Sequence, residues 1–258
     1  MTENPTPAGT AAPAATPRGD SDELVVDARQ VSKRYVRTWA LKAVDLQVRR
    51  GELVSLLGPN GSGKSTLLRI LMAVTRPTYG EVKLFGVPPK NGGAVRERLG
   101  VLPHQSYLYG ELTALENLRF AATMYGIHPV KQDLQEALAH VGLAHVADAQ
   151  VRTFSSGMRK RLALARATLH DPELVFLDEP YGALDVEGIA WVDSFITELR
   201  DARKTLVIAT HEIGRALALC DRAVSLHGGR VDFDGPTSEY SGAVSGQTVS
   251  VEVGAKAR

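Results

Sequence analysis

Short apolar runs recur along the chain and alternate with stretches whose apolar residues follow the period of a helix. The runs at 52–57, 174–177 and 205–209 are mainly apolar, as in strands that are buried on both faces. The stretches at 66–74 and 186–202 have helical spacing. Strands that alternate with helices predict an α/β fold with a parallel sheet covered on both faces. In such folds ligands bind beyond the carboxyl ends of the strands.

The regions around this core show other patterns. Residues 24–58 contain short apolar patches broken by polar residues, which predicts antiparallel strands leading into the buried strand, and residues 80–86 are typical of a further strand. From residue 104 to about residue 165 the pattern is helical, and we expect a helical subdomain there. Thr113 and Glu116 have the spacing of a capping box, which predicts the start of a helix.

The two ends of the chain differ from its middle. Residues 1–22 are rich in Pro, Ala and Thr and lack the basic start and apolar core of a signal peptide, so they are expected to form a disordered tail. Residues 23–230 are expected to form the main domain. Residues 231–258 are expected to be a C-terminal extension, in which the alternating valines of 249–253 are typical of a short strand.

Composition and charge exclude several classes of protein. The 258 residues carry a net charge of +1, which gives no basic field for nucleic acid, and we expect no nucleic-acid partner. Cys220 is the only cysteine, so a disulfide framework and a cysteine zinc site are excluded. No apolar stretch approaches the ~18 residues that cross a bilayer. These features favour a protein of the reducing cytosol.

The clearest chemical signal is a glycine-rich loop between a strand and a helix. The segment from Gly58 to Ser65 fits the pattern G-x-x-x-x-G-K-[ST]. Glycines allow backbone N–H groups to turn inward around an anion, and the following helix adds its positive end. In this pattern Lys64 reaches the phosphates of a nucleotide and the Ser65 hydroxyl binds Mg²⁺. The alternative is a glycine-rich turn that binds nothing, but the strand–loop–helix context favours phosphate.

Polar residues follow the next two buried strands. Asp178 ends the first of them, where it is expected to face Mg²⁺, and the adjacent Glu179 is expected to polarise the attacking water. Taken alone, an Asp-Glu pair after an apolar run is also typical of a solvated strand end. His211 follows the other strand and is expected at the same edge of the sheet as Lys64 and Asp178.

One further stretch, FSSGMRKRLALARATLHDPELVFLDEPYGALD at 154–185, resembles the signature region of ATP-binding cassette (ABC) ATPases. The resemblance extends over about residues 24–230, with the family's elements in order. It implies a P-loop NTPase core with a parallel sheet, an N-terminal antiparallel β subdomain and an inserted helical subdomain. It also implies the cofactors ATP and Mg²⁺ and the hydrolysis of ATP to ADP and phosphate.

The resemblance implies a role for each matched residue. The adenine would stack on Tyr35, Ser155 and Gly157 of the signature would bind the γ-phosphate held by a second cassette, and Asp185 would belong to the D-loop. Glu179 and His211 would be catalytic, and His104 or Gln105 would take the place of the family's Q-loop glutamine. The metal ligands would be Ser65, Asp178 and Gln105. The loop that binds the phosphates would comprise Gly58, Pro59, Asn60, Gly61, Ser62, Gly63, Lys64, Ser65 and Thr66.

Two departures from the family pattern lie in the signature. Ser156 stands where the family has glycine, and Met158 stands where it has glutamine. Ser155 and Gly157, to which the resemblance assigns the binding, are retained. We therefore expect a working signature.

A third departure bears on the cargo. Counting back from the segment Leu112–Asn117 places His104 at the Q-loop position, with Gln105 next to it. This pair, together with ALDVEG at 183–188, resembles the ATPase of the haem exporter of cytochrome c maturation, which is the favoured assignment. In the alternative, an ordinary cassette has lost one loop residue and Gln105 has the usual role. The stretch SSGMRKRL also resembles exporters of drugs, polysaccharides and sodium.

The resemblance further implies partners. A second cassette, identical or not, would complete the ATP sites, and membrane permease subunits would bind a groove near His104, Gln105, Tyr107, Leu108 and Tyr109. The protein would then lie peripherally on the cytoplasmic face of the membrane. A cassette that acts with a membrane partner without transport is the other possibility that the sequence leaves open.

Overall fold

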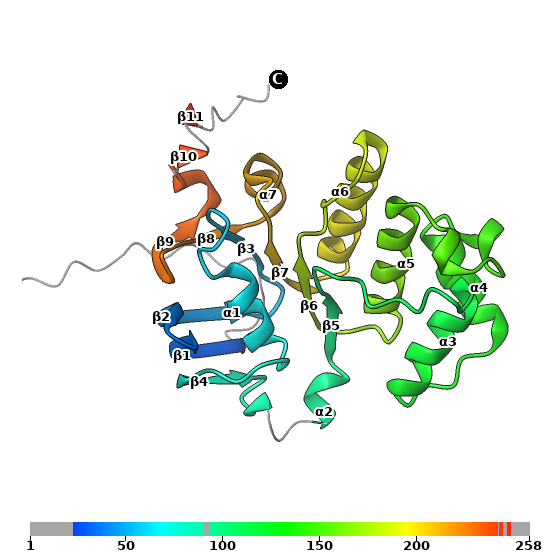
Figure 1. The fold of residues 1–258 in the computed structure, drawn as a ribbon, viewed down its shortest axis with the longest axis horizontal. Helices are drawn as coiled ribbons and strands as arrows, with labels where there is room; N and C mark the ends of the chain where they lie inside the picture. The colour runs from blue at the N-terminus through cyan, green and yellow to red at the C-terminus, as the bar shows by residue number, and fades with distance from the viewer. Residues whose placement is uncertain (1–22, 90–92, 242, 245–246, 249–258) are drawn as a thin grey trace, which may run out of the picture.

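The computed structural model describes residues 23–89, 93–241, 243–244 and 247–248, and it contains two main sheets (Figure 1). The smaller sheet is antiparallel, in the order β2-β1-β4. It comprises β1 (Leu24–Tyr35), β2 (Thr38–Arg49) and β4 (Tyr79–Leu84). The predicted antiparallel β region is therefore confirmed. The predicted tail at 1–22 and the valines of 249–253 lie outside the described residues.

The larger sheet has the order β5-β6-β7-β3-β8-β9. Its strands are β3 (Leu53–Leu57), β5 (Leu99–Leu102), β6 (Leu174–Asp178), β7 (Thr205–Ala209), β8 (Arg222–His227) and β9 (Arg230–Pro236). The first five strands in the order run parallel. All residues of β3, β6 and β7 are buried, as their apolar sequences predict.

The expectation of a parallel sheet is corrected at one edge, because β9 runs antiparallel to β8. Gly228 and Gly229 connect the two strands and have φ of +53° and +81°. A two-residue turn of this kind returns the chain directly alongside the preceding strand, which produces an antiparallel pair. The predicted boundary at residue 230 therefore lies at the start of a strand of the main sheet.

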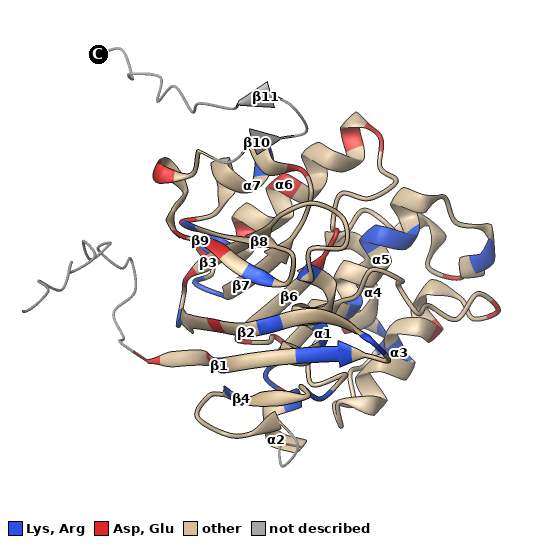
Figure 2. Ribbon diagram, turned by 60° about the vertical axis from the view of Figure 1, so that its left-hand side comes forward, with Lys and Arg blue, Asp and Glu red and all other residues tan. Residues whose placement is uncertain are grey.

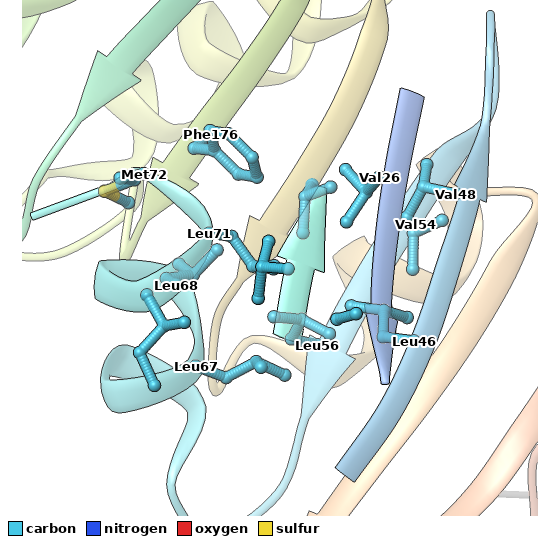
Figure 3. Packing of buried hydrophobic residues seen from close by; sticks show 14 of the residues in the cluster. Val26, Leu46, Val48, Val54, Leu56, Leu67, Leu68, Leu71, Met72 and Phe176 are labelled. Atoms are coloured by element: carbon cyan, nitrogen blue, oxygen red, sulfur yellow. The ribbon is translucent and has the colours of Figure 1, made fainter. Parts of the chain in front are cut away.

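Helix α1 (Lys64–Leu71) packs between the two sheets. Its Leu67, Leu68 and Leu71 belong to one buried cluster with residues of both sheets, among them Leu56 and Val26. Figure 3 shows these side chains directed toward one another between the helix and the strands. This packing fixes the start of α1 relative to the end of β3, which precedes it in the chain.

Four further helices form a second buried cluster with the other face of the sheet. They are α3 (Ala114–Met124), α4 (Lys131–His140), α5 (Ser156–Thr168) and α6 (Val186–Asp201). In Figure 1, α3 and α4 lie at the end of the molecule away from β1 and β2. Short elements complete the description: α2 (Gly93–Arg96), α7 (Ile213–Leu219), β10 (Ala243–Val244), β11 (Gln247–Thr248) and the 3₁₀ turns Ala144–Val146, Val151–Thr153 and Thr237–Glu239.

The predicted capping box is confirmed, but the helical region begins later than expected. The Glu116 N–H donates to the Thr113 hydroxyl at 3.2 Å, and the Thr113 N–H donates to the Glu116 carboxylate at 2.8 Å. Residues 104–113 form a loop instead of a helix. The Asn117 side chain holds this loop, accepting from the Tyr109 N–H at 2.9 Å and donating to its carbonyl at 3.0 Å.

Charged residues are spread over the fold. Basic and acidic positions are interspersed along the strands and helices (Figure 2), in keeping with the net charge of +1. Within the described part of the chain, the helices are all too short or too polar to span a membrane.

Candidate functional site

The residues predicted to bind and hydrolyse the nucleotide lie together at the carboxyl ends of the parallel strands of the main sheet. Strands β6, β7 and β3 are neighbours and run parallel, so their carboxyl ends lie side by side. Gly58 follows β3, Asp178 ends β6, and His211 comes two residues after β7. The topology therefore places the glycine-rich loop beside the Asp178-Glu179 pair and His211.

Two glycines in the loop are required by space as well as by backbone conformation. Gly58 has φ of +130°, and a Cβ at this position would lie 2.2 Å from the carbonyl oxygen of Leu226. Gly63 has φ of +114°, and a Cβ there would lie 2.6 Å from the carbonyl oxygen of Ala40. Both contacts are too close for a real Cβ atom, so only glycine allows the loop to run between β2 and β8.

The loop contains polar groups suited to an anion. The buried Ser62 hydroxyl has no hydrogen-bond partner among the described residues. The Lys64 side chain is also buried, and its Nζ donates to the carbonyls of Gly58 at 2.6 Å and Pro59 at 3.3 Å. Burial lowers the pKa of Lys64, while the carboxylates of Glu179 and Asp178 oppose this shift. A buried cation and a free hydroxyl at a helix start fit a phosphate group.

Ser65 and Asp178 form a pair of oxygen groups next to the loop. The Ser65 hydroxyl donates to Asp178 Oδ1 at 3.2 Å, and Asp178 is only 2 % exposed. Burial raises the pKa of Asp178, although the Ser65 hydrogen bond and the nearby His104 lower it. A hydroxyl and a carboxylate are ligands that Mg²⁺ accepts together with phosphate oxygens. The residues present therefore fit both a nucleotide and its metal ion.

Glu179 and His211 form the other pair at this edge. His211 Nδ1 lies 2.8 Å from Glu179 Oε2, and the Glu179 side chain is 14 % exposed against 59 % for His211. Glu179 has φ of +52°, and its N–H donates to the Ala209 carbonyl at 2.8 Å. A partly buried carboxylate held by a histidine is suited to act on a water molecule beside the loop.

Two hollows adjoin the loop, and His104 lines both. The first, of about 390 Å³, is lined by Tyr35, Ala40, Asn60, Gly61, Ser62, Gly63, Lys64, Ser65, Thr66, Arg69, His104 and Glu179. The second, of about 930 Å³, includes Gly58, Pro59, Asn60, His104, Glu179 and His211 in its lining. Gln105 lines neither of them; it lines a third cavity of about 480 Å³, to which His104 and Asp178 also contribute. Of the two residues predicted for the Q-loop position, His104 is the one that lines the hollows beside the glycine-rich loop.

Three residues of the predicted site lie away from the glycine-rich loop of this chain. Ser155 is the N-cap of α5 and accepts from the Met158 N–H at 3.2 Å, and Gly157 lies in the first turn of that helix. Asp185 is the N-cap of α6 and accepts from the Gly188 N–H at 2.8 Å. None of these residues lines either hollow. Their predicted roles therefore require a second copy or a similar chain.

The sequence did not indicate two basic residues of α5 that contact this region. Lys160 Nζ donates to the Glu179 carbonyl at 2.9 Å. The Arg166 guanidinium donates to the carbonyls of Ser106 at 2.6 Å and Tyr107 at 3.0 Å. Basic residues are frequent on this helix, and their spacing alone does not distinguish a solvated side chain from one that reaches another element.

The chain is similar to known proteins of one family. A family model described as ABC transporter matches residues 41–182. The chain is 34% identical to the ABC transporter ATP-binding protein NatA of Bacillus subtilis, over 80% of this chain and 85% of the relative. It is 36% identical to a Nod factor export ATP-binding protein I of Cupriavidus pinatubonensis, over 82% of this chain and 66% of the relative. It is 37% identical to a fluoroquinolones export ATP-binding protein of Mycobacterium tuberculosis, over 88% of this chain and 76% of the relative.

Solved structures show the same fold. An ATP-binding cassette solved as a dimer in a post-hydrolysis state, bound to ADP and phosphate, superposes with a TM-score of 0.77. It is 29% identical in sequence, and the match covers 83% of this chain and 100% of that one. An ATP-binding subunit of an ABC transporter superposes with a TM-score of 0.76 at 30% identity, over 82% of this chain and 90% of that one.

Proposed function

This chain belongs to the family of ABC transporter ATP-binding proteins, and we propose that it powers export through separate membrane permease subunits. The chain is an ATPase with the α/β fold that the sequence predicted. Two of the relatives reported above are named for export, of Nod factor and of fluoroquinolones. The observation that carries the site assignment is the meeting of Lys64, the Ser65–Asp178 pair and the Glu179–His211 pair at one sheet edge.

In this proposal each residue of the edge has one task. The Lys64 ammonium and the loop N–H groups bind the phosphates, and the adenine stacks on Tyr35, which is 44 % exposed beside the hollow. Ser65 and Asp178 would hold Mg²⁺, and the ion would supply positive charge that neutralises the phosphates. Glu179 accepts a proton from the attacking water, and His211 holds the Glu179 carboxylate in place. His104 takes the Q-loop position.

We assign Ser155 and Gly157 to the nucleotide of a second cassette. The hydroxyl of Ser155 and the N–H groups at the start of α5 form an anion site that is remote from this chain's own loop. Two cassettes facing each other would place each signature opposite the other chain's loop. The dimeric assembly of the similar post-hydrolysis structure supports this arrangement. ATP would then hold the two chains together, and hydrolysis would release them.

The cavity of about 480 Å³ is the docking groove that we propose for the permease. It lies between the loop 103–109 and α3, and its lining includes Tyr107, Tyr109, Phe120 and Met124. These four side chains are between 44% and 71% exposed. The rings of Tyr109 and Phe120 pack edge to face with centroids 4.9 Å apart. An apolar surface of this kind beside a nucleotide site favours a partner that covers it, and it would hold the protein at the cytoplasmic face of the membrane.

Changing Tyr107 and Tyr109 together to serine is expected to weaken permease binding about tenfold, the effect of losing a typical aromatic anchor. Transport should fall with it, whereas ATP affinity should stay the same because neither residue lines the loop hollow. Co-purification with the permease encoded nearby measures the first effect, and a nucleotide-binding assay measures the second. Tyr79→Ser is the matched control, since Tyr79 is an exposed tyrosine on β4, away from the docking groove. Full co-purification of the double variant would exclude the docking groove.

For the cargo, the named relatives favour the resemblance of SSGMRKRL to exporters of drugs, polysaccharides and sodium over the haem exporter. The haem-exporter assignment depends on His104-Gln105 and on residues 183–188, whereas none of the relatives reported above is named for haem export. We therefore propose an exporter of the drug, polysaccharide or ion type. Reconstituting the chain with its neighbouring permease in vesicles tests this choice. ATP turnover stimulated by haem, and not by a fluoroquinolone, a Nod factor or sodium, would restore the haem assignment.

A further inference from the structure

The Glu179 carbonyl has an uncommon partner. Lys160, in the second turn of α5, donates from its Nζ to this carbonyl oxygen at 2.9 Å. The Gly182 N–H donates to the same oxygen at 3.2 Å. The backbone of Glu179 is thus bonded on both sides, since its own N–H donates to Ala209 on β7. The direction of the Glu179 side chain depends on these backbone bonds.

Glu179 needs such support because of its conformation. Its φ of +52° lies in the left-handed region, which a residue with a Cβ adopts only at a cost. Conformations of this kind persist where surrounding bonds over-determine them. If the Glu179 peptide rotated toward the usual region, the Cβ would point elsewhere and the carboxylate would leave His211, which it now contacts at 2.8 Å.

The surroundings of Lys160 act on its ammonium in two opposite ways. Burial lowers the pKa of Lys160, and the carboxylates of Glu179 and Asp178 oppose the shift, as they do for Lys64. The two acidic residues therefore lie near two lysines from different elements. Lys64 belongs to the phosphate loop, whereas Lys160 bonds the backbone and leaves the Glu179 carboxylate to His211.

We propose that Lys160 is a positioning residue for hydrolysis, which holds the Glu179 turn so that the carboxylate points at the attacking water. The proposal rests on the proposed role of Glu179. Because Ser155 caps the same helix, a shift at the start of α5 would reach the Glu179 carbonyl through Lys160. The contact therefore links the signature of this chain to its own catalytic turn.

Lys160→Met keeps the length of the side chain and its packing but removes the donor. We expect kcat for ATP hydrolysis to fall at least tenfold, while the Kd for ATP stays within twofold, because the phosphate loop is unchanged. Lys204→Met is the matched control. Lys204 is also a partly buried lysine, and its Nζ bonds Asp171. It directly precedes β7, at the amino ends of the strands, whereas Glu179 lies at their carboxyl ends. Its variant should keep the wild-type kcat.

Two further measurements separate a positioning role of Lys160 from a purely structural one: thermal unfolding of the variants, and the effect of Lys160→Met in the Glu179→Gln protein. The two methionine variants should have similar melting temperatures. In the Glu179→Gln background, adding Lys160→Met should leave ATP-induced dimers intact, because the residue that it positions is already inactive. A wild-type kcat in Lys160→Met, a Kd that rises as much as kcat falls, or loss of dimers in the double variant would each overturn the proposal. If the Glu179→Gln variant hydrolysed ATP as fast as the wild type, the proposed role of Glu179 would be overturned instead.

Lys160→Leu keeps the test available if the methionine variant does not fold. Leucine is a good helix former and has no donor, so it cannot bond the Glu179 carbonyl. Lower kcat with unchanged ATP affinity supports the proposal, and wild-type kcat overturns it.

Discussion

Replacing Glu179 with glutamine is expected to abolish ATP turnover while leaving ATP binding intact. The amide keeps the shape of the side chain and its contact with His211, which the carboxylate makes at 2.8 Å. An amide cannot accept a proton from water, so general-base catalysis, typically worth about 10²- to 10⁴-fold, is lost. The variant should accumulate as a dimer with bound ATP. Phosphate release measures turnover, and size-exclusion chromatography with ATP and Mg²⁺ detects the dimer.

Glu212→Gln is the matched control for this experiment. Glu212 also lies near His211, at 3.7 Å from Nε2, but it is more exposed than Glu179. If any carboxylate near His211 were sufficient, both variants would lose activity. We expect the Glu212 variant to hydrolyse ATP at the wild-type rate and to remain free of trapped dimers. Near-wild-type turnover in the Glu179 variant would remove Glu179 from the mechanism.

The elements around the loop could be predicted from the sequence because their signals are local. The apolar run that ends at Leu57 becomes a strand with every residue buried, and the helix begins at Lys64, directly after the last glycine. Thr113 and Glu116 form both bonds of the capping box that their spacing predicts. Periodicity and caps operate within a few residues of one another, so a single sequence carries them.

Other features depend on contacts between distant segments, and the sequence did not reveal them. The loop at 104–113 has apolar residues typical of a helix, but Asn117 and Arg166 bind its backbone in an irregular path. The left-handed conformation of Glu179 has no signal in its residue type, since it results from bonds to Ala209 and Lys160. The path of residues 104–113 also places His104, and not Gln105, in the hollow beside the glycine-rich loop.

Lys64→Ala is expected to weaken ATP binding itself. Lys64 provides the side-chain charge of the phosphate loop, and hydrogen bonds to charged groups contribute about 1.5–3 kcal/mol. The Kd for ATP should therefore rise about 10- to 100-fold, since about 1.4 kcal/mol corresponds to a factor of ten. Isothermal titration calorimetry measures the affinity. Lys83→Ala is the control, because Lys83 lies on β4, outside both hollows next to the loop.

The stability of the Lys64 variant separates lost binding from lost folding. Burial lowers the pKa of Lys64, because the folded surroundings of its side chain disfavour the charged ammonium. The folded-state pKa lies below the unfolded one, so this cost is present at lower pH and fades as pH rises past the folded pKa. Replacing Lys64 by methionine keeps the volume and removes the cost, although it also removes the bonds to Gly58 and Pro59. We expect the melting temperature of Lys64→Met without nucleotide to match or exceed that of the wild type, while ATP raises it less. A fall in melting temperature without nucleotide, with ATP affinity unchanged, would mean that Lys64 stabilises the loop and does not bind phosphate.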